Sequence, residues 1–78
     1  MSRDQHALAE VRAEMVATVL QVVTSVGAAV VAGQTMLVLE SMKMEIPVLA
    51  EAGGTVVGLP VPVGAVVQEG DVLVLLAL

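Results

Sequence analysis

The 78-residue chain contains no cysteine, phenylalanine, tyrosine or tryptophan. The absence of cysteine excludes a disulfide framework and a thiolate metal site, and it fits a reducing compartment. Without aromatic rings, the chain offers no platform on which the bases of a single-stranded nucleic acid could stack. The hydrophobic core must therefore be aliphatic, and it draws chiefly on eighteen valines and ten leucines. Because valine is branched at Cβ and packs well on a pleated surface, this composition favours β-strands.

Positive charge is also scarce. The fixed cations are Arg3, Arg12 and Lys43, and eight acidic residues bring the formal net charge to −5. Nucleic-acid binding requires a basic patch, which three separated cations cannot form. An acidic surface instead suits a partner with a basic docking face. The scarcity of cations therefore predicts no nucleic-acid partner. The sequence also holds no Ser-His-Asp set and no catalytic pair of carboxylates, so it predicts no enzyme activity of its own.

One long stretch lacks charge altogether. Residues 15–39 carry no charged side chain, and a helix of that length could cross a bilayer core of about 30 Å. Gly27 and Gly33 interrupt the stretch, however, and polar residues recur along it, as expected for short strands joined by turns. We therefore predict no membrane helix. Residues 1–6 lead into no apolar segment of the signal-peptide type, which predicts a cytoplasmic protein.

The sequence is internally repeated with an offset of 37 positions. The matched pairs include Val11 and Val48, Ala13 and Ala50, Glu14 and Glu51, Thr18 and Thr55, and Val19 and Val56. Each copy also reads Val-Gly-Ala-x-Val-x-x-Gly, at 26–33 and 63–70, where the glycines permit the positive φ of tight turns. The half-repeats cover about 11–41 and 48–78. Residues 1–10 lie outside them and are expected to be a disordered tail.

The repeat predicts the architecture. Longer strands are expected at 18–23, 35–40, 55–61 and 72–77, and neither half can bury its apolar face alone. Two halves packed face to face then give an all-β sandwich or flattened barrel with a pseudo-two-fold axis. The segment 60–62 contains two prolines, which cannot donate ladder hydrogen bonds, so it is expected at an edge or a bulge.

The junction between the two copies contains the only lysine of the chain, within Glu40-Ser41-Met42-Lys43-Met44-Glu45. The strand that ends at Glu40 must turn back into 46–49, so Met42 and Lys43 should form the tip of a hairpin, although the turn has neither glycine nor asparagine. Exposed methionine surface gains nothing in water. Two methionines around a lone amine therefore indicate a lysine that a partner reads or modifies. Strand alternation leaves open that one of the methionines is a core residue.

This six-residue segment resembles the acceptor motif of biotinyl domains, the biotin carboxyl carrier modules of biotin-dependent carboxylases. The resemblance covers residues 11–78 and is closest to small stand-alone biotinylated proteins. It implies a barrel-sandwich hybrid of two four-stranded antiparallel sheets with the acceptor lysine at a hairpin tip. It also implies that Lys43 receives biotin from a biotin protein ligase through an amide bond. The biotin would then carry carboxylate between the biotin carboxylase and the carboxyltransferase of an acyl-CoA-type carboxylase.

The resemblance gives roles to the neighbours of the lysine as well. Ser41 belongs to the motif, Met42 and Met44 would be apolar shoulders contacted by partner enzymes, and Glu40 and Glu45 would dock on a basic ligase surface. The alternative for the two glutamates is an ordinary solvated hairpin edge. Two other functions remain open for the protein. One is a lipoyl carrier, although lipoyl domains typically have Asp-Lys-Ala at this point, and the other is a biotinylated reservoir or binding protein without a carboxylase. No metal site is predicted.

The chain departs from the pattern of biotinyl domains in its turns. The first turn has residues 14–17, Glu-Met-Val-Ala, where the family often has Pro-Met-x-Gly. Ala17 stands where the second copy has Gly54, so a different turn or strain is expected there. The Gly-Asp pair of the family turns is kept at Gly70-Asp71 but becomes Gly33-Gln34 in the first copy.

Overall fold

The computed structural model describes residues 7–78, and within them the chain is all-β, as predicted. No helix in this range is long and apolar enough to span a bilayer. The strands are β1 (Leu8–Arg12), β2 (Ala17–Val22), β3 (Ala29–Val30), β4 (Thr35–Ser41), β5 (Met44–Leu49), β6 (Gly54–Gly58), β7 (Val66–Val67) and β8 (Val72–Ala77).

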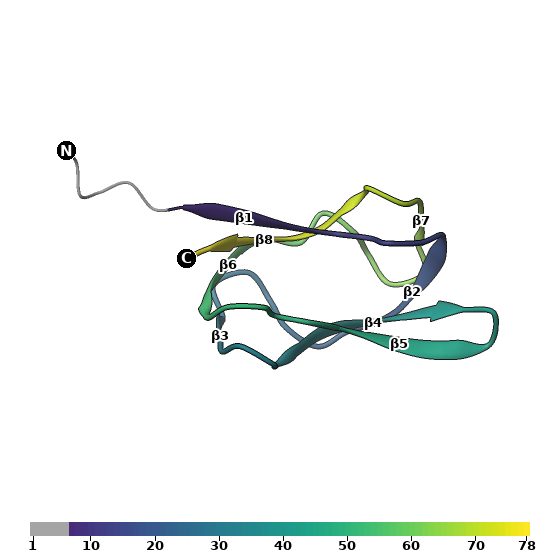
Figure 1. The fold of residues 1–78 in the computed structure, drawn as a ribbon, viewed down its shortest axis with the longest axis horizontal. Coiled ribbons are helices and arrows are strands. Elements are labelled where there is room, and N and C mark those ends of the chain that lie inside the picture. The colour runs from purple at the N-terminus through teal and green to yellow at the C-terminus, as the bar shows by residue number, and fades with distance from the viewer. Residues whose placement is uncertain (1–6) are drawn as a thin grey trace.

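The strands form two four-stranded antiparallel sheets, in the orders β1-β8-β6-β3 and β5-β4-β2-β7 (Figure 1). The sheet count and the pseudo-two-fold repeat are confirmed. The two halves do not form one sheet each, because each sheet takes its two inner strands from one half and its two outer strands from the other. The halves are therefore interleaved.

Reciprocal hydrogen bonds join the two halves at the glycine turns. The backbone N–H of Gly27 donates to the carbonyl of Val56, and that of Gly64 donates to the carbonyl of Val19, both at 2.8 Å. Both glycines have a φ above 90°, which is the left-handed backbone predicted for these turns. Because each turn bonds to the other half, neither half can complete its hydrogen bonding alone.

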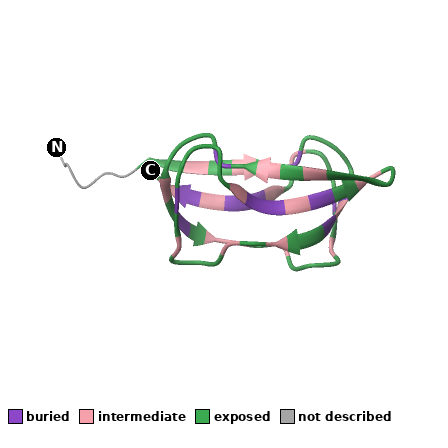
Figure 2. Cartoon of the chain, turned by 90° about the horizontal axis from the view of Figure 1, so that it is seen from below, coloured by how far each residue is buried: buried purple, intermediate pink, exposed green. Residues whose placement is uncertain are grey.

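The core lies between the sheets (Figure 2) and obeys the same symmetry. Within the described residues, every buried core residue except Ala17 belongs to a pair related by the 37-residue offset. These pairs are Ala13 and Ala50, Val19 and Val56, Val30 and Val67, Met36 and Leu73, Leu37 and Val74, and Leu39 and Leu76. Both copies of the sequence therefore build one shared core.

β-Bulges allow neighbouring side chains to face the core together. On β4, Thr35 pairs with Leu49 and Leu37 with Val48, so Met36 is an extra residue, and both Met36 and Leu37 are fully buried. Leu73, the repeat partner of Met36, is the extra residue on β8 in the same way. A bulged strand departs from strict alternation. The consecutive apolar residues at 36–39 and 72–76 fit a strand with or without a bulge, so the sequence did not reveal this local geometry.

The prediction that residues 1–10 form a disordered tail is wrong for residues 8–10, because these residues lie in β1. That strand pairs with β8 in the register Leu8 to Ala77, and the N–H of Leu78 donates to the carbonyl of Ala7 at 2.9 Å. Backbone pairing needs no particular side chains, so β1 can be the structural counterpart of β5 with little sequence identity. The rest of the predicted tail, residues 1–6, lies outside the described residues.

The second copy also contains a shorter strand than predicted. β6 ends at Gly58, whereas the sequence predicted a strand to 61, and the bulge on this strand lies at Val57. Pro60 and Pro62 lie in the irregular segment that follows β6. Proline carries no N–H for a ladder, so the strand ends before them.

The departures in the turns prove compatible with the fold. Ala17 does not have a positive φ, and it is buried at the start of β2, so the strain expected there is absent. In the first copy, the side-chain oxygen of Gln34 accepts a hydrogen bond from the N–H of Val31 at 3.0 Å. The carboxylate of Asp71 accepts one from Gln68 at 2.8 Å. Glutamine therefore replaces the turn aspartate without loss of this bond.

Candidate functional site

The predicted acceptor segment is the hairpin between β4 and β5. The two strands pair from Thr35 and Leu49 to Ser41 and Met44, which leaves Met42 and Lys43 as a two-residue turn. Their φ angles are 53° and 65°. Positive φ at both central residues is the signature of a type I′ turn, whose twist matches that of the flanking strands. The hairpin tip predicted from the repeat junction is present.

The backbone of this turn is unfavourable for its residues. Type I′ turns prefer asparagine, aspartate or glycine, because a larger L side chain in the left-handed region places Cβ close to the following carbonyl. Within residues 7–78, Met42 and Lys43 are the only non-glycine residues with positive φ. The long β4–β5 ladder holds them there. Backbone strain is thus concentrated at the lysine.

Both methionines beside the lysine point into solvent. The exposed fraction is 90% for Met42 and 61% for Met44, whereas Met36 in the core has an exposure of 0%. The alternative in which one flanking methionine belongs to the core is therefore wrong. The two side chains give the hairpin an apolar surface on either side of the amine, and this surface contributes little to folding.

The tip of the β4–β5 hairpin lies at the opposite end of the molecule from the C-terminus (Figure 1), and it extends beyond the buried parts of the strands (Figure 2). Lys43 is exposed. Within residues 7–78, the salt bridge present joins Arg12 to Glu10, and Lys43 has no carboxylate partner. The same residues hold no group of three potential metal ligands close enough to bind an ion. The amine is therefore accessible to a partner from several directions.

Two carboxylates flank the base of the turn. Glu40 on β4 and Glu45 on β5 are direct cross-strand partners, and both are exposed. They come directly after the pair that closes the two-residue turn, so they are a non-hydrogen-bonded pair, in which side chains approach most closely. Like charges in this arrangement destabilise a sheet. The pair therefore gives no benefit to the fold.

The remaining motif residue ties the hairpin to the body. The hydroxyl of Ser41 donates a hydrogen bond to the carbonyl of Val16 at 3.3 Å. Val16 lies between β1 and β2, in the turn where the chain departs from the pattern of biotinyl domains. Sequence reasoning did not predict this contact, because the two residues are distant in the chain and a backbone carbonyl has no sequence signal.

Comparison with known proteins gives consistent matches. The model of the family described as "Biotin-requiring enzyme" matches residues 9–76. A "Biotinylated protein TB7.3 homolog" of Mycobacterium leprae is 50% identical over 68 residues, which are 87% of this chain and 96% of that protein. A "Biotin carboxyl carrier protein" of Streptococcus mutans is 40% identical over 65 residues, which are 83% of this chain and 50% of that protein.

A solved structure shows that the fold of this chain is also similar to that of a known protein. A single-chain, multi-domain long-chain acyl-CoA carboxylase superposes with a TM-score of 0.85 and 34% identity. The match covers 90% of this chain but 7% of that protein. The chain thus spans nearly all of one small biotinylated relative, half of a carrier protein and a small part of a complete carboxylase.

Proposed function

The chain belongs to the family of biotin-requiring carrier domains, and we propose that Lys43 is the residue through which it carries covalent biotin. The observation that carries the proposal is the position of the chain's only lysine, exposed at the tip of the β4–β5 hairpin. The names of the two relatives given above refer to biotin, so they do not favour a lipoyl group.

The residues fit attachment of an acyl group. Amide formation needs the Nζ atom to lose a proton, to attack a carboxyl carbon activated by a ligase, and to displace the activating group. Lys43 has no carboxylate partner within residues 7–78 that would need to be displaced first. We assign the base that removes this proton to the ligase. The turn places the Cα of Lys43 at the hairpin tip, from which its exposed side chain projects.

The flanking residues would serve recognition by the ligase. The apolar surfaces of Met42 and Met44 are available for burial against a partner, and methionine adapts well to irregular surfaces. The carboxylates of Glu40 and Glu45 would steer a basic ligase surface towards the tip. Ser41 would keep the hairpin in place through its bond to Val16.

Once attached, biotin supplies a ring that accepts a carboxyl group at one enzyme site and gives it up at another. The chain contributes presentation, because a tethered group is held at high local concentration near each site in turn. We propose that a biotin carboxylase and a carboxyltransferase are these partners, and that the protein works in the cytoplasm. The alternative is a biotinylated reservoir. It is favoured by the 96% coverage of a relative described only as biotinylated.

Attachment is tested by co-expression of the protein with a biotin protein ligase. The wild-type chain should gain the mass of one biotinyl group and bind streptavidin, whereas Lys43→Arg should do neither. The Arg variant keeps a long cation at the tip, and its circular dichroism spectrum should match that of the wild type. Biotin on a folded Lys43→Arg variant would contradict the assignment.

The carrier and the reservoir are then separated with the biotinylated protein. Incubation with a biotin carboxylase, ATP and labelled bicarbonate should transfer label to the wild-type protein but not to Lys43→Arg. A biotinylated protein that accepts no label from the carboxylases of its own cells would favour the reservoir.

A further inference from the structure

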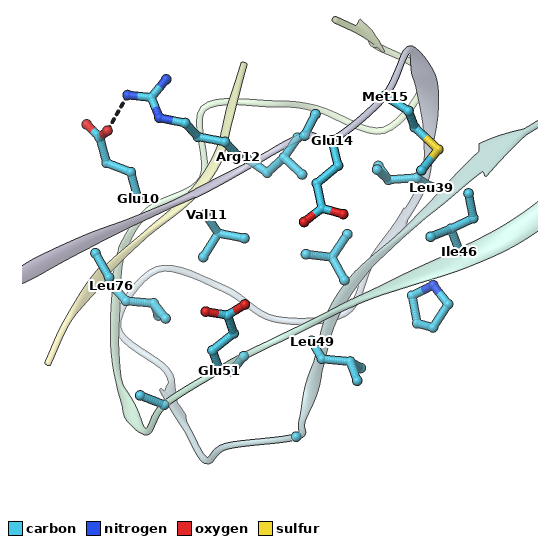
Figure 3. Close-up of a pocket in the computed structure, with 18 of the residues that line it drawn as sticks. Glu10, Val11, Arg12, Glu14, Met15, Leu39, Ile46, Leu49, Glu51 and Leu76 are labelled. Carbon is cyan, nitrogen blue, oxygen red and sulfur yellow. Dashed lines mark hydrogen bonds and ion pairs between the residues drawn. The ribbon is translucent and has the colours of Figure 1, made fainter. Parts of the chain in front are cut away.

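A groove runs along the open side of the barrel, between β1 at the edge of one sheet and β5 at the edge of the other (Figure 3). Its volume is about 750 Å³. The floor is apolar and includes the half-buried side chains of Val11, Ile46 and Val48. It begins near the base of the hairpin, at Met15 and Ile46, and does not include Lys43.

The repeat places two carboxylates in this groove. Glu14 and Glu51 are partners under the 37-residue offset, and both line it. Figure 3 shows their carboxylates directed into the same space from the β1 side and the β5 side. Arg12 also lines the groove, but its guanidinium is bonded to Glu10 and to the carbonyl of Gly70. The groove therefore combines an apolar floor with the exposed carboxylates of Glu14 and Glu51.

The two edges of the groove differ in their capacity to bind another strand. The bond from Leu78 to Ala7 fixes the alternation of the β1–β8 ladder, so the backbone groups of Leu8 and Glu10 face away from β8. No strand of residues 7–78 pairs with β1 on that side. On β5, the residue equivalent to Glu10 is Pro47, which has no N–H. The β1 edge is open, whereas the β5 edge is blocked.

We propose that this groove binds an extended segment of a partner protein, in which a lysine or arginine stands between apolar residues at alternate positions. The segment adds to β1 as a further strand, with hydrogen bonds to the backbone of Leu8 and Glu10. Its cation lies between Glu14 and Glu51, and its apolar side chains cover Val11 and Ile46. Charge selects this occupant over a second copy, because the groove is acidic and each chain has a net charge of −5.

The probe for the test is the peptide acetyl-Thr-Val-Thr-Lys-Thr-Val-Thr-amide, with a glutamate-for-lysine peptide as its control. Titration of the ¹⁵N-labelled protein should give saturable shifts at the amides of β1 and β5. The amides of Leu8 and Glu10 should become protected from hydrogen exchange. The control peptide should bind at least tenfold more weakly, because its carboxylate would face two others.

Matched variants connect the binding to the groove. Glu14→Gln combined with Glu51→Gln should weaken the lysine peptide at least tenfold, whereas Glu69→Gln, an exposed change outside the groove, should leave its affinity unchanged. Glu10→Pro copies Pro47 onto β1 and should abolish binding. Glu10→Thr removes the same charge but keeps the N–H, so it should bind the peptide more tightly than Glu10→Pro does.

Three results would overturn the proposal. One is the absence of saturable shifts at millimolar peptide. Another is unchanged affinity in the double glutamine variant or in Glu10→Pro, each verified as folded by its spectrum. The third is a dimer, detected by sedimentation and dissolved by Glu10→Pro, that the lysine peptide does not displace. In that case the occupant of the β1 edge is a second copy.

Discussion

Replacement of Met42 by a residue that tolerates positive φ should relieve the backbone strain at the hairpin tip. The same change should weaken recognition of the tip by the ligase. Met42 has a φ of 53° and is 90% exposed, so its side chain stabilises the fold little. A bulky residue in the left-handed region costs about 1–2 kcal/mol, and asparagine tolerates that region well. We therefore expect Met42→Asn to raise the free energy of unfolding by about 1 kcal/mol. In a domain of this size, that corresponds to an increase in Tm of about 4–8 °C.

The control for this prediction is Met42→Ala. It removes the same exposed side chain but keeps a Cβ in the left-handed region, so its stability should stay close to that of the wild type. Urea denaturation and thermal melting of the unbiotinylated proteins measure the difference. An asparagine variant no more stable than the alanine variant would refute the assignment of strain. Both variants should be biotinylated more slowly, because both lose the methionine surface that we propose the ligase contacts.

Two further stability predictions follow from close contacts and turns. Gly54→Ala should destabilise the protein by about 1–3 kcal/mol, because a Cβ there would lie 2.6 Å from the carbonyl oxygen of Ala77. Gly53→Ala, whose Cβ would approach nothing closer than 3.4 Å, is the matched control and should cost less in the same urea titration. Asp71→Ala should cost about 0.5–1.5 kcal/mol through loss of its bond to the N–H of Gln68, and equal stability of variant and wild type would contradict that role.

Several features of the fold were readable from the sequence because they depend on local chemistry. Glycine permits positive φ at little steric cost, so Gly27 and Gly64 marked the same turn in both copies. The repeat then placed Lys43 at the junction between the copies, and the hairpin lies there. The exposure of both flanking methionines was decided only by the structure, because strand alternation fitted either placement.

Other features depended on contacts between distant residues. The strand nature of residues 8–10 follows from pairing with β8, and main-chain hydrogen bonds leave no trace in side-chain pattern. The burial of both Met36 and Leu37 follows from a bulge that alternation cannot reveal. The fit of Ala17 likewise became clear only from its backbone conformation.

The sequence by itself thus determined that the protein is an all-β repeat with one lysine between two methionines at its centre, because composition and periodicity act locally. The tertiary structure alone decided that the halves interleave, since strand partners are chosen by hydrogen bonds across the whole chain. It also brought Glu14 and Glu51 to one groove. A repeat fixes which residues are equivalent, but only the packing of the two halves decides that equivalent residues meet.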